Sequence, residues 1–175
     1  SYDMYSDKGY EKSPEAHYAT MSIEQLKALR VDQLAAPACL MFLWAIWPRL
    51  PEAIELMQAW CFTYKTGGAW IKRTAGGKTA FGTGYVLRSA SEPFLIGVLG
   101  APDYSGEQRK IRNVIESIDS AIDAVRREHS RKPEDQYTIL ERILPGVAKA
   151  ELFARSARAG WSSWGNELGK FGAAS

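Results

Sequence analysis

An almost continuously apolar run is the feature that most constrains the fold. Residues 38–44 (ACLMFLW) carry no charged side chain, which is typical of a parallel strand that is covered on both faces. Pro48 and Pro51 favour a helix over residues 52–60. Strand character returns over residues 62–73. Strand, helix and strand at this spacing predict a right-handed crossover unit of an α/β domain.

Size and composition are those of one globular domain. The chain has 175 residues, of which 46% are hydrophobic, and we therefore expect a single domain over residues 1–175. A net charge of +2 means that any nucleic-acid-binding patch is local. Cys39 and Cys61 lack metal-ligand spacing, and we expect both to be core residues of a protein in a reducing compartment. No membrane span or signal sequence is recognisable, so we expect a soluble, cytoplasmic protein.

Further elements follow from local patterns. Residues 22–29 predict a short helix with Ser22 as its cap and Gln25 completing a capping box. Residues 91–100 predict another apolar strand.

The glycine-rich segment 74–85 contains GGKT, which resembles the end of a phosphate-binding loop. The first glycine of that motif would fall at Lys72, and no amphipathic helix follows, so we reject this interpretation. A mobile surface loop is the better interpretation, and its basic flanks suit a phosphate backbone. A merely solvated, hairpin-like loop is the alternative. The basic residues are Lys72, Arg73, Lys78 and Arg88.

Residues 149–155 alternate in character and predict a short, buried strand. Glu151 and Arg155 lie in this strand, where charged groups are costly unless they are paired or bind a ligand. The following residues, 160–167, predict an aromatic turn that ends in an amide and a carboxylate, and such a turn could hold a flat ring and ribose hydroxyls. The alternative is a C-terminal strand with two core tryptophans.

A basic run, residues 126–132, precedes a predicted helix that starts at Pro133 and stops before Pro145. Such runs are usually solvated surface. Here, however, Lys132 stands at the N-terminus of a helix, where backbone amides and the helix dipole attract an anion. Ser130 could cap the helix or help to hold that anion.

Several segments together resemble one enzyme family, the adenine-N(6) methyltransferases that include the catalytic subunit of the messenger-RNA adenosine methyltransferase and bacterial and phage relatives. The matching segments, in the family's order, are AHYATMS, MFLWAIWPRL, GGAWIKR, GTGYVLRSASEPFLIG, RREHSRKPEDQY, ELFAR and GWSSWGNE. The resemblance covers nearly the whole chain. Within it, residues 112–115 match a short family strand, and residues 117–124 form a run longer than the family usually has there, which suggests a helical insertion without an assigned function. The resemblance implies a Rossmann-like fold with a mostly parallel sheet and helices on both faces. It also implies that this chain lacks the first strand of that fold, which carries the family's catalytic motif.

The resemblance also implies a cofactor, S-adenosylmethionine, and a nucleic-acid substrate in which DNA is favoured over RNA. The resemblance implies no binding to a membrane. A homodimer or a heterodimer is compatible with the family. The residues that match cofactor ligands are Ser130, Lys132, Glu151, Arg155, Asn166 and Glu167. Those that match substrate-binding positions are Tyr18, Lys72, Arg73, Lys78 and Glu92. No metal is implied.

Family members activate the 6-amino group of adenine with the tetrapeptide Asp-Pro-Pro-Trp, and positioning and electrostatics supply most of the catalysis. These 175 residues contain no such tetrapeptide, so no catalytic residue is assigned. We therefore expect either a fragment of an adenine methyltransferase or a natural short relative that cannot methylate alone. The alternative function is a non-catalytic subunit that scaffolds nucleic acid or a partner enzyme.

Overall fold

The structure is a computed structural model that describes residues 20–82, 84, 86–118, 132–166 and 168. The predicted site residues Tyr18, Ser130 and Glu167, and most of the expected insertion, lie outside these ranges. The chain divides into two compact units, Ser1–Pro102 with Asn113–Arg131, and Asp103–Arg112 with Lys132–Ser175. The expectation of a single domain stays a prediction.

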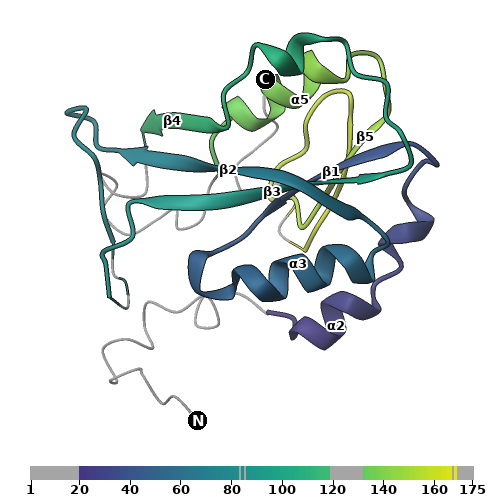
Figure 1. The fold of residues 1–175 in the computed structure, drawn as a ribbon, viewed down its shortest axis with the longest axis horizontal. Helices are drawn as coiled ribbons and strands as arrows, with labels where there is room; N and C mark the ends of the chain where they lie inside the picture. Colours follow the sequence, from purple (N-terminus) through teal and green to yellow (C-terminus); the bar gives the residue numbers. More distant parts are fainter. Residues whose placement is uncertain (1–19, 83, 85, 119–131, 167, 169–175) are drawn as a thin grey trace. The chain divides into compact units, whose positions relative to one another are not determined.

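The first unit contains a four-stranded sheet in the order β1-β3-β2-β4 (Figure 1). Its strands are β1 (Cys39–Trp44), β2 (Thr63–Arg73), β3 (Ser91–Leu99) and β4 (Val114–Ile118). β3 runs antiparallel to both β1 and β2, whereas β2 and β4 are parallel. The α/β class is confirmed. The expected mostly parallel pairing is wrong for this sheet, because β3 inserts between the two strands of the predicted crossover.

The helix predicted over residues 22–29 is confirmed as α2 (Ile23–Ala28), and its capping box between Ser22 and Gln25 is present. A short 3₁₀ turn, η2 (Val31–Gln33), follows it. The proline-opened helix is η3 (Trp47–Arg49) continued by α3 (Leu50–Ala59). The indole N–H of Trp60, at the end of α3, donates to the Leu26 carbonyl at 2.9 Å and so ties the two helices together.

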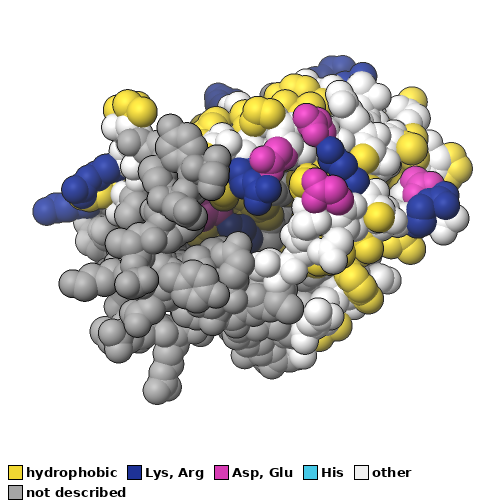
Figure 2. Space-filling model, turned by 90° about the horizontal axis from the view of Figure 1, so that it is seen from below, with side chains coloured by type: hydrophobic (Ala, Val, Ile, Leu, Met, Phe, Trp, Pro, Cys, Tyr) yellow, Lys and Arg dark blue, Asp and Glu magenta, His cyan; other side chains and the backbone are white. Residues whose placement is uncertain are grey.

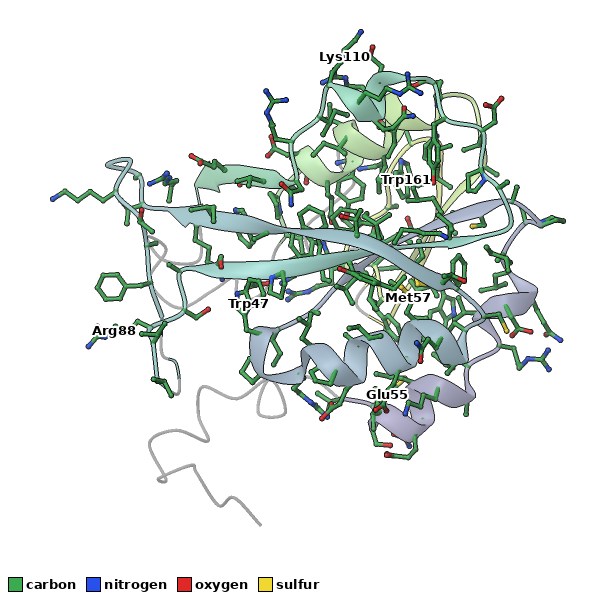
Figure 3. The ribbon with its side chains drawn as sticks, viewed as in Figure 1. Trp47, Glu55, Met57, Arg88, Lys110 and Trp161 are labelled. Carbon is green, nitrogen blue, oxygen red and sulfur yellow. The ribbon has the colours of Figure 1, made fainter. Side chains whose placement is uncertain are left out.

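One face of the sheet is covered by α3. The side chain of Met57 points from α3 towards the sheet (Figure 3) and is fully buried. A Cβ atom at Gly97 of β3 would lie only 2.5 Å from the Met57 sulfur, so the absence of a side chain there permits the close packing. In the described part of this unit, α2 lies beside α3 on the same side of the sheet. The expectation of helices on both faces of the sheet stays a prediction.

The C-terminus of α3 is closed by two backbone bonds, from Cys61 N–H to the Gln58 carbonyl and from Phe62 N–H to the Met57 carbonyl. This is the Schellman pattern, which places one residue in the left-handed region. Cys61 occupies that position with φ 65°, where glycine is usual. The residue is also exposed, so the core role predicted for it is wrong.

The second unit contains η4 (Glu107–Arg109), α5 (Asp135–Ile143), β5 (Lys149–Leu152) and β6 (Trp161–Trp164). α5 begins two residues after Pro133, whose carbonyl accepts from the Gln136 N–H. β5 and β6 pair in parallel. None of the helices in the described ranges is long and apolar enough to cross a membrane.

Two predictions for the C-terminal segment need correction. The strand expected to reach Arg155 ends at Leu152, because Phe153 has a φ of 62° and turns the chain out of the extended conformation. The expected aromatic turn contains the strand β6 instead. Its tryptophans are not core residues either, since Trp161 is half-buried and Trp164 is 52% exposed.

Candidate functional site

In the first unit, aromatic side chains gather on the sheet face opposite α3. Successive strand residues point to opposite faces, so the packing of Gly97 on α3 directs Phe94 to the other side. There Phe94 stacks on Phe42, with ring centroids 4.5 Å apart, and meets the edge of Trp44 at 5.7 Å. Trp44 in turn contacts Trp70 at 6.2 Å. This face therefore combines rigid aromatic surfaces in the geometry that such rings prefer.

A half-buried ion pair borders the aromatic face. Lys72 Nζ lies 2.6 Å from a carboxylate oxygen of Glu92, and the two side chains are only 22% and 19% exposed. The ammonium also lies 4.9 Å from the centroid of the Trp70 ring. The indole Nε1 of Trp70 is buried and has no hydrogen-bond partner in the described part of the chain. Two predicted substrate residues, Lys72 and Glu92, are thus brought together with an indole donor.

Arg73 points away from Lys72, because the two are neighbours on one strand. Its guanidinium donates to Thr79 Oγ1 at 2.7 Å and forms an ion pair with Glu116 at 3.0 Å. Lys78 lies exposed in a tight turn, in which the Thr74 N–H donates to the Lys78 carbonyl at 2.9 Å. The hairpin-like alternative therefore describes residues 74–79 well. Among the described basic residues at this loop, Lys78 and Arg88 make no ion pair, whereas Lys72 and Arg73 do.

Tyr137 of α5 is the centre of a cluster in the second unit. Its hydroxyl donates to Glu151 Oε1 of β5 at 2.8 Å. Its ring meets Trp161 of β6 edge-on at 5.2 Å and lies 3.9 Å from the guanidinium carbon of Arg158. Arg158 also forms an ion pair with Glu134 at the start of α5. These contacts fix the helix, both strands and their connection to one another.

The environment of this cluster shifts two pKa values. Burial raises the pKa of Glu151 above its ordinary value, and the hydrogen bond from Tyr137 only partly opposes that shift. Burial likewise lowers the pKa of Arg158. The Trp161 indole N–H donates to Glu141 Oε1 at 2.8 Å. Glu151 is thus a carboxyl held in place by a neighbouring phenol, as expected for a charged strand residue with a specific partner.

Arg155 and Asn166 follow the carboxyl ends of two paired parallel strands. The Ala154 N–H donates to the Trp164 carbonyl at 2.9 Å. Gly165 packs directly on this backbone, since a Cβ there would lie 2.7 Å from the Ala154 nitrogen and would clash with its carbonyl oxygen. The predicted ligands Arg155 and Asn166 are therefore backbone neighbours. The carboxyl ends of parallel strands are the usual place for ligands in α/β folds.

The remaining predicted cofactor residue in the described ranges is Lys132, which is half-buried and lies three residues before α5. Sequence reasoning missed Tyr137 and Arg158 as site residues. The available signal was the phenol of Tyr137, because a half-buried tyrosine hydroxyl usually has a polar partner. Arg158 gave no comparable signal, since its partners come from another element.

A sequence model of the MT-A70 family matches residues 4–167. The chain belongs to the MT-A70 family. The resemblance derived from the sequence is thereby confirmed, and the family match spans every predicted site residue.

Relatives of this MT-A70 chain carry methyltransferase names. An Arabidopsis thaliana protein named N(6)-adenosine-methyltransferase MT-A70-like is 32% identical over 169 residues, which are 94% of this chain and 23% of that protein. The Type II methyltransferase M.MunI of a Mycoplasma species is 31% identical over 154 residues, covering 86% of this chain and 60% of that enzyme. The human N(6)-adenosine-methyltransferase catalytic subunit METTL3 is 25% identical over 94% of this chain and 28% of its own length. The chain thus spans about a quarter of the plant and human proteins.

The donor set of the second unit fits S-adenosylmethionine. An ammonium before a helix N-terminus suits the methionine carboxylate of this cofactor, and Lys132 supplies it. The exposed amide of Asn166 can exchange hydrogen bonds with ribose hydroxyls. The direct packing of Gly165 on Ala154 holds Asn166 next to Arg155. When bound, such a cofactor supplies an electrophilic methyl group.

Proposed function

We propose that the protein of this MT-A70 chain transfers a methyl group from S-adenosylmethionine to the 6-amino group of adenine in DNA. The observation that carries the proposal is the adjacency of Arg155 and Asn166 at the carboxyl end of a parallel strand pair, in a chain whose family match includes both residues. We further propose that the two units belong to one Rossmann-like methyltransferase fold. Three strands of the first sheet, β1, β2 and β4, share a direction, which supports this.

Cofactor binding is assigned to the second unit. Lys132 binds the carboxylate as a charge-assisted partner, while Arg155 and Asn166 hold the ribose and adenine ends. Glu151 positions this region through its bond from Tyr137 rather than as an exposed acceptor. Ser130 and Glu167 remain proposed ligands on the family resemblance alone.

The acceptor adenine is assigned to the aromatic face of the first unit. Glu92 is a hydrogen-bond acceptor that Lys72 holds in place, and the adjoining rings of Trp70 and Trp44 exclude water. Tyr18 is proposed beside the same base on the family resemblance. The two half-buried charges are less screened by salt than surface pairs, so they can act on a polar amine at short range.

We favour DNA over RNA as the substrate because of the similarity to the bacterial type II methyltransferase. This chain covers a larger share of that enzyme than of the plant and human relatives. The phosphate-binding surface is assigned to the loop after β2. By contrast, basic and acidic side chains lie next to each other on the side of α2 and α3 (Figure 2), where Lys27 pairs with Glu55 and Arg49 with Glu52. Mixed charge of this kind does not favour a polyanion.

The test is transfer of labelled methyl from S-adenosylmethionine by the full-length protein, with single-stranded DNA, double-stranded DNA and RNA as acceptors. Nuclease digestion and mass spectrometry should then identify N6-methyladenine. Labelled RNA with unlabelled DNA would refute the substrate assignment. Nucleic-acid binding without any transfer would favour the non-catalytic scaffold instead.

Cofactor binding is tested separately by calorimetry with S-adenosylhomocysteine, which keeps the carboxylate. Lys132→Ala should lose about 1.5–3 kcal/mol of binding free energy, the range for a hydrogen bond to a charged group. Lys149→Ala is a matched control, because that ammonium bonds the Val147 carbonyl of its own segment. Equal affinities of the Lys132 variant and the wild type would remove Lys132 from the site.

A further inference from the structure

The loop between β2 and β3 ends in an exposed apolar tip. Val86 is 95% exposed and Leu87 is 82% exposed, the highest values among the large hydrophobic residues of the described chain. Scattered single apolar residues need no explanation on a protein surface. Two adjacent, almost fully exposed apolar residues do need one, because their side chains stay in water and contribute no hydrophobic stabilisation to the fold. Such a tip is suited to a partner.

The base of this loop is firmly connected to the sheet. Ala80 N–H donates to the Lys72 carbonyl at 2.9 Å, and Lys72 N–H donates to the Ala90 carbonyl at 3.2 Å, so both ends of the loop are bonded to β2. Gly82 N–H then donates to the Ser89 carbonyl at 2.8 Å and closes the loop above that base. The described base of the loop is therefore a defined extension of the sheet.

Near the apolar tip, the described residues of the loop are in close backbone contact. Gly84 packs on the Leu87 backbone so closely that a Cβ would clash with the Leu87 carbonyl oxygen and lie 3.1 Å from the Ser89 nitrogen. The exposed fractions of Val86 and Leu87 place both side chains on the outer surface of the loop.

The surroundings of the tip are basic. Between Arg73 and Ala90 the sequence has three basic residues, Arg73, Lys78 and Arg88, and no acidic one. The Arg88 guanidinium carbon lies 5.1 Å from the centroid of the Phe81 ring, and Figure 3 shows Arg88 projecting from the loop away from the sheet. A cation held on an aromatic ring beside an apolar tip matches a polyanion that also offers apolar surface, as DNA does.

We propose that Val86 and Leu87 form a wedge that enters the base stack of duplex DNA beside the target adenine, while Lys78 and Arg88 contact the flanking phosphates. The inference rests on the proposed function. An adenine in a duplex must leave the stack before its amine can be methylated. Apolar side chains inserted at a base step replace the lost stacking, as in many proteins that kink DNA. Phosphate contact alone needs no apolar tip.

The first experiment measures unstacking without catalysis. The full-length protein is mixed with S-adenosylhomocysteine and with a duplex in which 2-aminopurine replaces the adenine of the sequence it methylates or, failing methylation, binds best. Fluorescence of 2-aminopurine rises when the base unstacks. The wild type and the control Leu34→Ser should both raise it, since Leu34 is a 69% exposed leucine of the same unit. The double variant Val86→Ser, Leu87→Ser should raise it little.

The second experiment measures methyl transfer. On duplex DNA the double variant should be slower by about tenfold or more, because burial of one such side chain contributes at least about that factor. On single-stranded DNA its rate should equal that of the wild type. A mismatch opposite the target adenine should restore most of the duplex rate, because the base is then already partly unstacked.

The outcomes separate the wedge from the proposed function. If the double variant unstacks 2-aminopurine as the wild type does, or slows single-stranded and duplex substrates equally, the wedge is wrong. If the wild type neither binds nor unstacks a duplex, the wedge is also wrong. If the wild type unstacks the base but transfers no methyl, the proposed function fails and the wedge stands. Unchanged urea unfolding of the double variant would confirm that the loop substitutions leave the fold intact.

Discussion

Gly165→Ala should disrupt the proposed cofactor site, because the new side chain would collide with backbone atoms of that site. The added Cβ would lie 2.7 Å from the Ala154 nitrogen and 3.0 Å from the Phe153 carbonyl carbon, and it would clash with the Ala154 carbonyl oxygen. All three atoms are backbone, so no side chain can rotate away. The segments after β5 and β6 must instead separate by about 1 Å to reach ordinary van der Waals distances.

The magnitude follows from the bond that this separation breaks. Ala154 is 1% exposed, and its N–H donates to the Trp164 carbonyl at 2.9 Å. A buried donor left without a partner costs roughly 1–3 kcal/mol. The usual gain from replacing glycine with alanine, about 0.4–1 kcal/mol, requires a site without strain. We therefore expect a net loss of about 1–3 kcal/mol in the free energy of unfolding of this unit.

The assay is urea unfolding of the protein, followed by tryptophan fluorescence because Trp161 and Trp164 belong to β6. Gly76→Ala is the matched control, since the new Cβ would lie 3.9 Å from Thr74 Oγ1, an ordinary van der Waals distance. Affinity for S-adenosylhomocysteine should fall in the Gly165 variant and not in the control. Identical unfolding and affinity in the two variants would refute the close packing that places Asn166 beside Arg155.

Three further predictions test other parts of the structure. Cys61→Gly should raise the free energy of unfolding by up to about 1 kcal/mol, because it removes left-handed strain at the end of α3; Cys61→Ala keeps that strain, and an equal gain there would contradict the reasoning. Burial raises the pKa of Glu151 above its ordinary value, so the stability that the protonated carboxyl contributes is present in acid and is lost as the pH rises through the folded-state pKa. Glu151→Gln should flatten that decline in a pH series of urea unfolding, and a curve parallel to the wild type would contradict it. Lys78→Ala should weaken DNA binding similarly across sequences, and the slope of log K for DNA binding against log salt concentration should become shallower by about one. Lys72→Ala should leave this slope unchanged. Equal slopes for the two variants would contradict the assignment of different roles to the two lysines.

Local signals in the sequence predicted local structure well. Ser22 and Gln25 specify the start of α2 because both halves of a capping box lie within one turn. The apolar run after Glu92 specifies β3 by composition. Strand direction is different, because the antiparallel entry of β3 between β1 and β2 depends on contacts between residues far apart in the sequence. An apolar run cannot encode that choice.

The site was harder to predict for the same reason. Lys72 and Glu92 are twenty residues apart, and only the register that aligns Trp70 with Glu92 brings them together. Register is set by the whole sheet and its turns. Arg155 and Asn166 become neighbours through the parallel register of β5 and β6, whereas the sequence predicted a turn where β6 lies. The left-handed Phe153, which ends β5, carries no sequence signal, since bulky residues rarely adopt that conformation.

Strand alternation in β2 separates two kinds of chemistry that the sequence places side by side. Lys72 and Arg73 are consecutive, so they point to opposite faces of the sheet. Lys72 is held by Glu92 beside the aromatic face, and Arg73 is held by Glu116 and Thr79. A cation already paired with a carboxylate gains less from a phosphate, because the existing pair must first be broken. We therefore assign phosphate contact to Lys78 and Arg88 beyond the end of β2, and not to the consecutive basic pair from which the sequence-based prediction began.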